Sequence, residues 1–258
     1  FWSPDTPTCQ LFTGHVGCGK STELLQLKAQ LEREGFHIVY FESSKNLEMA
    51  DVDVSDILLA IAARVSQSLD RMERDCSQNP KAILKQVAKL LQTEIELTAE
   101  ASVPGLGDVA ASTEGDFSVD VGIPGVGKVK VSQEEGLSFV APLIGKITAK
   151  AKASPEFRNK LRGYLEPRTN GILEAINSEL IEPGIKRLKD DGKKGLVVIV
   201  DNLDRIDSSV KPWGRNQQEY LFVDRGEQLR SLNCHLIYTM PLALRFSNEF
   251  GPLTQRFK

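Results

Sequence analysis

The residue types with the clearest chemical meaning form one glycine-rich run near the start of the 258-residue chain. The run matches the pattern G-x-x-x-x-G-K-[ST] and reads Gly14, His15, Val16, Gly17, Cys18, Gly19, Lys20, Ser21, Thr22. Glycines at this spacing let backbone N–H groups surround phosphate oxygens, and a helix beginning near Lys20 directs its positive dipole end at the anion. Lys20 would neutralise the terminal phosphates, and the Ser21 hydroxyl would bind Mg²⁺. The run therefore predicts a binding site for a magnesium-bound nucleotide.

A second group of candidate residues follows the apolar run 196–200. Asp201 ends this run at the carboxyl end of a predicted strand and would hold Mg²⁺ directly or through water. Asp204 is a candidate to orient or deprotonate an attacking water molecule. Asn202 stands where many ATPases carry a catalytic Glu, so slow hydrolysis is expected. Thr239, at the end of the next strand, is either a sensor of the γ-phosphate or of that water, or an ordinary polar residue at a strand end.

Alternating and periodic apolar residues predict the elements that position these groups. A strand, the glycine loop, a helix and a second strand come first, which implies a parallel strand pair with a right-handed crossover. The later apolar runs add two more strands, so we expect an α/β fold with a mainly parallel sheet. The predicted strands are 8–13, 36–41, 196–201 and 234–240, and the main predicted helices are 21–34, 53–72, 80–91, 154–191 and 217–232.

The composition changes between residues 93 and 127, where acidic residues, Gly, Val and Ala are frequent and Lys and Arg are missing. Alternation within residues 117–131 predicts a β-hairpin on an insertion, and a disordered glycine-rich loop is the alternative. A second glycine pattern at 122–128 is rejected as a nucleotide site, because Val129 follows it and offers no hydroxyl to magnesium. We thus expect a nucleotide-binding core in two parts, 1–92 and 156–258, separated by an insertion at 93–155.

The overall composition excludes some classes of function. The formal net charge is -3, which does not suit a general polyanion binder. The basic excess within residues 146–194 comes without interleaved aromatic residues, so it leaves nucleic acid as an unsupported partner. No apolar run is long enough to predict a membrane span, and four Cys without metal-ligand spacing favour a reducing cytoplasm. The chain begins without Met, and we expect it to be part of a longer protein.

The order of these motifs resembles that of the additional-strand class of P-loop ATPases. Within that class the chain is similar to the AAA+ and STAND signalling ATPases, and its Asp201-Asn202-Leu203-Asp204-Arg205 run is similar to the Walker B motif of the KAP group. The resemblance implies a three-layer P-loop NTPase fold with strand order 5-1-4-3-2, whose fifth strand and helical lid would follow Lys258. It further implies ATP and Mg²⁺ as ligands. Arg205, Arg225, Arg230 and Arg245 are candidate arginine fingers for a neighbouring subunit, and solvated surface arginines are the alternative.

The expected function is an ATP-binding and ATP-hydrolysing module that acts as a regulatory or signalling switch within a larger protein. Its partners would be ATP and either a protein or a second copy, engaged through flanking domains. An AAA+ ATPase that remodels or loads protein or DNA is one alternative. A nucleotide-binding scaffold with little hydrolysis is another.

Overall fold

The computed structural model describes residues 6–72, 152–211, 214–248 and 250–257. In these ranges four parallel strands form one sheet with the order β1-β4-β3-β2. The strands are β1 (Cys9–Thr13), β2 (His37–Glu42), β3 (Leu196–Asp201) and β4 (His235–Met240). The prediction of an α/β fold with a parallel sheet is confirmed, and so is the predicted order of these four strands.

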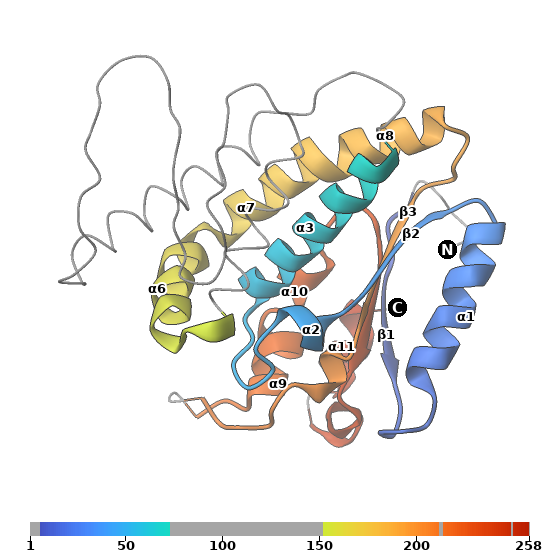
Figure 1. Ribbon diagram of the computed structural model, residues 1–258. Coiled ribbons are helices and arrows are strands. Elements are labelled where there is room, and N and C mark those ends of the chain that lie inside the picture. Colours follow the sequence, from blue (N-terminus) through green and yellow to red (C-terminus); the bar gives the residue numbers. More distant parts are fainter. Residues whose placement is uncertain (1–5, 73–151, 212–213, 249, 258) are drawn as a thin grey trace, which may run out of the picture.

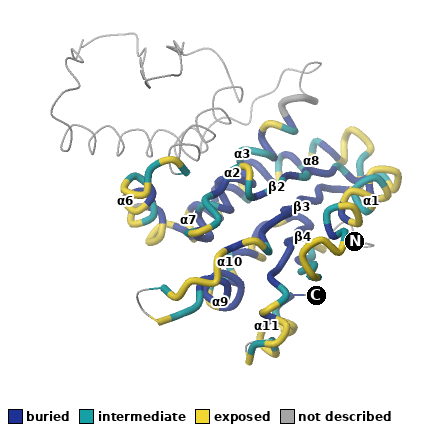
Figure 2. The backbone as a smooth tube through the Cα atoms, turned by 60° about the horizontal axis from the view of Figure 1, so that its bottom comes forward, coloured by how far each residue is buried: buried dark blue, intermediate teal, exposed yellow. Residues whose placement is uncertain are grey.

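The two central strands, β3 and β4, are buried along their whole length. Their continuous apolar sequences are explained by this position, because a strand covered on both faces has no side that favours polar residues. The outer strands β1 and β2 contain partly exposed positions. Figure 2 shows this gradient, with buried strands at the centre and exposed residues on the surrounding helices.

Helices cover both faces of the sheet (Figure 1). On one face, α1 (Lys20–Arg33) packs Leu24 and Leu31 against Val197 and Ile237. On the other face, α3 (Val54–Met72) and the helices that follow residue 154 bury a larger apolar cluster. Because β1 runs directly through the glycine loop into α1, the loop lies at the carboxyl edge of the sheet.

The predicted helix 154–191 is interrupted. A 3-10 turn containing Pro167 and a π-helical turn just before Pro183 divide it. A proline has no N–H for the helical ladder and its ring crowds the preceding turn, so the ladder changes at these places. The segments are α6 (Pro155–Leu165), α7 (Thr169–Ile176) and α8 (Glu182–Asp190).

Shorter helices complete the described ranges. The predicted helix 217–232 is also divided, into α9 (Gln217–Glu219), a π-helical turn and α10 (Gly226–Arg230). The hydrogen bond from Arg225 N to Tyr220 O, at 3.0 Å, spans five residues and belongs to that wider turn. The remaining helices of the described ranges are α2 (Ser43–Asn46), directly after β2, α11 (Phe250–Arg256), and two 3-10 helices, Leu203–Arg205 and Leu242–Phe246.

Several predictions fall on residues that the structure does not describe. These are the helix 80–91, the hairpin at 117–131, the second glycine pattern at 122–128 and nearly all of the insertion 93–155.

In the described ranges, none of the helices combines the length and apolarity that crossing a membrane requires. The described cysteines Cys9, Cys18 and Cys234 are free thiols.

A cluster of charged side chains fastens the segment after α2 to the rest of the core. The Asp51 carboxylate accepts hydrogen bonds from Arg162 at 2.9 and 3.0 Å and from Lys211 at 2.6 Å. Burial raises the pKa of Asp51, but hydrogen bonds and charge from Lys211 and Arg162 outweigh it, so that the pKa is lowered. Burial raises the pKa of Asp56 to about 6, against the opposing effects of the Asp53 N–H and Arg162.

Candidate functional site

The loop between β1 and α1 needs glycine at specific positions. Gly17 and Gly19 have φ angles of 82° and 90°, a left-handed conformation that costs about 1–2 kcal/mol for a residue with a Cβ. At Gly14 an added Cβ would lie 2.8 Å from the Cys18 Sγ, so the exposed Cys18 side chain would have to move. His15 and Val16 are exposed at the tip of the loop. The loop therefore forms a tight turn that is exposed to solvent directly before α1.

Lys20 bends its side chain back beneath this loop. Its Nζ donates hydrogen bonds to the carbonyl oxygens of Gly14 and His15, each at 2.9 Å. The same Nζ lies 3.1 Å from Asp204 Oδ2, and the two side chains are only 9% and 7% exposed. Lys20 of the glycine pattern is therefore ion-paired with Asp204, which belongs to the predicted run 201–205 after β3 (hereafter the β3 motif).

The turn after β3 holds Asp204 in place through Thr239. The Thr239 Oγ1 is fully buried and accepts hydrogen bonds from the backbone N–H of Leu203 at 2.8 Å and of Asp204 at 3.3 Å. Among the described residues, Asp204 Oδ1 has no hydrogen-bond partner although the atom is buried. Thr239 thus stabilises the turn at Leu203 and Asp204. Its contact with a phosphate or a water molecule stays a prediction.

Asp201 is almost completely buried, with 1% of its surface exposed. Its Oδ2 accepts a hydrogen bond of 2.7 Å from the Tyr40 hydroxyl, and its Oδ1 accepts one of 2.7 Å from Asn202 N. Burial, and then the hydrogen bond and negative charge of Asp201, raise the pKa of Tyr40 well above its usual range, so Tyr40 stays a donor. Each oxygen keeps a further lone pair for a cation.

Asn202 adopts a left-handed conformation with φ 63°, which asparagine tolerates better than most residues. Its side-chain Nδ2 donates to Glu42 Oε2 at 3.3 Å. Glu42 ends β2 and is the register partner of Asp201 on β3. The carboxyl ends of β2 and β3 therefore bring a second acidic side chain next to the predicted magnesium ligand.

The structure joins some predicted residues directly. Lys20 meets Asp204, and Thr239 supports the Asp204 turn. Ser21 is half-buried in the first turn of α1, and Thr22 is exposed there. Both therefore directly follow the loop, at the start of α1.

Tyr40 and Glu42 were missed by sequence reasoning. The signal was present, because the predicted strand order placed the end of 36–41 beside the end of 196–201. Side chains of register partners in neighbouring strands point to the same face, so residues 40 and 42 had to be near Asp201 once the register was known. The register itself is not written in the sequence pattern of either strand.

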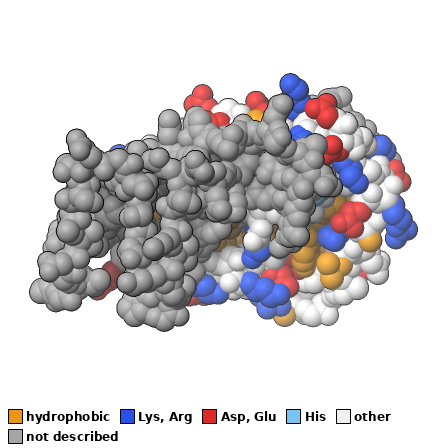
Figure 3. Space-filling view, turned by 45° about the horizontal axis from the view of Figure 1, so that its top comes forward, with side chains coloured by type: hydrophobic (Ala, Val, Ile, Leu, Met, Phe, Trp, Pro, Cys, Tyr) orange, Lys and Arg blue, Asp and Glu red, His pale blue; other side chains and the backbone are white. Residues whose placement is uncertain are grey.

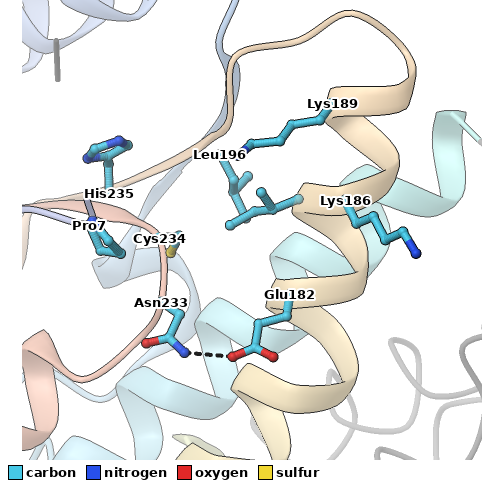
Figure 4. A pocket seen from close by; sticks show the side chains of 9 residues that line it. Pro7, Glu182, Lys186, Lys189, Leu196, Asn233, Cys234 and His235 are labelled. Atoms are coloured by element: carbon cyan, nitrogen blue, oxygen red, sulfur yellow. Dashed lines mark hydrogen bonds between the residues drawn. The ribbon is translucent and has the colours of Figure 1, made fainter. Parts of the chain in front are cut away.

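The hollow shown in Figure 4 lies away from this site. It encloses about 530 Å³ where β3 and β4 begin, which is the opposite end of the sheet from the loop. Asn233 donates to Glu182 there at 2.8 Å, and Lys186 and Lys189 of α8 are among the lining residues. These residues therefore take no part in the arrangement around Lys20.

Figure 3 shows one face of the molecule, on which the described Lys and Arg side chains are interspersed with Asp and Glu. Among the described residues, no group of three or more His, Cys, Asp or Glu side chains is suited to hold a metal ion by itself.

Comparisons of the chain with protein-family models, with curated proteins and with solved structures gave no match.

Proposed function

We propose that this chain is a P-loop ATPase module that binds and hydrolyses ATP and acts as a regulatory or signalling switch. The observation that carries the proposal is the buried contact between Lys20 and Asp204. Two sequence patterns far apart in the chain, each predicted to handle a nucleotide, meet at one edge of a parallel sheet. Open α/β sheets bind their ligands at this edge.

The residues present fit a magnesium-bound nucleotide. Ser21 and Asp201 supply hydroxyl and carboxylate oxygens, the hard ligands that Mg²⁺ prefers. Asp204 Oδ1 is a buried acceptor to which none of the described residues donates. The glycine loop leads into α1, whose first turn has N–H groups without helical partners. The proposed ligands are therefore ATP, held by residues 14–22, and Mg²⁺, held by Ser21 and Asp201.

Each residue then has a defined task. Lys20 neutralises the terminal phosphates, and Asp204 holds the lysine beneath the loop until a phosphate takes its place. Thr239 fixes the turn that carries Asp204. Bound Mg²⁺ neutralises charge that develops on the transferring phosphoryl group. The assignment of Asp204 as the group that orients the attacking water stays a prediction.

The same pair suggests how a switch would work. A phosphate competes with Asp204 for the charge of Lys20, because both are anions within reach of one ammonium group. When Lys20 turns to the phosphate, the Asp204 carboxylate and its turn lose a partner. The conformation of residues 203–206 would then depend on the nucleotide, as a switch to a protein partner or a second copy requires.

A second candidate is a nucleotide-binding scaffold with little hydrolysis. Asn202 favours it, because an amide at this position cannot accept a proton from water. Both carboxylates on the β3 side already have partners, Asp201 with Tyr40 and Asp204 with Lys20. The two candidates share the binding site and differ only in turnover.

A titration of the chain with ATP in the presence of Mg²⁺, followed by a measurement of phosphate release, tests the proposal. We expect Lys20→Ala to weaken ATP binding by about 100-fold or more, because it removes the charge aimed at the phosphates. Lys28→Ala is the matched control, since Lys28 lies on the same helix and pairs with Glu32 at the helix surface. Equal affinity in Lys20→Ala and Lys28→Ala would reject the nucleotide site.

A further inference from the structure

The carboxylates at this edge of the sheet differ in their access to solvent. Asp201 is 1% exposed, and the Asp204 side chain is 7% exposed and paired with Lys20. The Glu42 side chain is 32% exposed. A general base must reach the water molecule from which it takes a proton and must later release that proton. Of these three groups, Glu42 has the most open path for both events.

Glu42 is also directed towards the site. As register partners in neighbouring strands, Glu42 and Asp201 have backbones about 4.8 Å apart and side chains on the same face. Tyr40, two residues earlier on β2, confirms the orientation because its hydroxyl reaches Asp201 Oδ2. The end of β2 therefore contributes to the same edge as the β3 motif.

Asn202 holds the Glu42 carboxylate through Nδ2 at 3.3 Å. The left-handed backbone conformation of Asn202 fixes the direction in which the Asn202 side chain leaves the main chain. On its other oxygen Glu42 meets Lys45 at 2.8 Å, but the Lys45 side chain is 68% exposed. An ion pair with so much solvent contact holds its partner weakly. The Asn202 amide is thus the contact that links Glu42 to the site.

We propose that Glu42 is the general base of ATP hydrolysis, supplied by the end of β2 beside Asn202. The inference rests on the proposed ATPase function. The water oxygen forms a bond to the γ-phosphorus, and the bond from that phosphorus to the bridging oxygen breaks. ADP leaves with the electron pair of the broken bond. The proton from the water passes to the Glu42 carboxylate and from there to solvent.

The test compares three variants in phosphate-release and ATP-binding assays. Glu42→Gln keeps the size of the side chain and an acceptor for Asn202, but it cannot take a proton at neutral pH. We expect it to lower kcat by about 100-fold or more, the lower end of the range for general base catalysis, with ATP affinity unchanged within threefold. Glu42→Asp keeps a carboxylate and should retain at least tenfold more activity than Glu42→Gln. Glu48→Gln is the matched control in the segment after α2 and should behave as wild type.

The outcomes separate this inference from the proposed function. If the wild-type chain binds no ATP, the proposed function fails and the role of Glu42 falls with it. If the wild type hydrolyses ATP and Glu42→Gln does so within threefold of the same kcat, the proposed function stands and Glu42 is not the base. Equal loss of activity in Glu42→Asp and Glu42→Gln would likewise overturn the inference, because position rather than proton transfer would then explain the loss.

Discussion

The buried pair of Lys20 and Asp204 makes a prediction about stability that needs no nucleotide. The perturbation is a double-mutant cycle formed by Lys20→Met, Asp204→Asn and the double variant. At the observed 3.1 Å, an effective dielectric constant of about 20 gives a gross attraction of about 5 kcal/mol. Desolvation of both groups cancels part of this attraction, so the net value of the pair is smaller.

The single substitutions should have unequal costs. Lys20→Met leaves a buried carboxylate whose second oxygen has no partner in the described part of the chain, and we expect a loss of about 3 kcal/mol in the free energy of unfolding. Asp204→Asn should cost less, about 1–2 kcal/mol, because Lys20 keeps its bonds to two carbonyl oxygens. The double variant should be less destabilised than the sum, with a coupling energy of about 2 kcal/mol.

Urea unfolding followed by circular dichroism measures all four proteins of the cycle. A coupling energy below about 0.5 kcal/mol would refute the reasoning, because additive effects of that kind are seen for residues that do not interact. A second set of curves with Mg-ATP extends the test. ATP at 100 times its Kd should stabilise the wild type by about 2.7 kcal/mol and the Lys20→Met variant by much less.

Three further predictions concern the loop and the buried charges. Ser21→Ala should weaken ATP binding by about tenfold with Mg²⁺ but not with EDTA, as titrations under both conditions would show, because the variant lacks the metal-binding hydroxyl. Gly19→Ala should lower the free energy of unfolding by about 1–2 kcal/mol through its left-handed φ, whereas Gly171→Ala, within α7, should not; equal melting temperatures would contradict this. Folding raises the pKa of Asp56 from 3.8 to about 6, so between these pH values the folded protein binds more protons than the unfolded chain. The folded protein therefore loses stability as pH rises through this range. Asp56→Asn cannot ionise and should gain stability relative to wild type from pH 4 to pH 6 in urea unfolding; a constant difference would oppose this assignment.

Much of the fold could be predicted from local pattern. The apolar run of β3 and the β-branched run of β2 identified their strands within a residue or two, because burial on a sheet selects side chains position by position. The glycine loop was equally clear, since a left-handed backbone at Gly17 and Gly19 excludes most other residues. The helix 154–191 was predicted as one element, because its apolar periodicity continues across the turns at Pro167 and Pro183.

The sequence by itself determined which residues can do chemistry: a lysine after a glycine loop, and acidic residues after a buried strand. Only the tertiary structure decided their partners. The register between β2 and β3 allows Tyr40 to hydrogen-bond to Asp201 and Asn202 to hydrogen-bond to Glu42. The packing of residues 203–205 against the glycine loop brings Asp204 into its ion pair with Lys20. The physical reason is that periodicity reports burial along one element, whereas a hydrogen bond depends on the relative position of two elements within a fraction of an ångström.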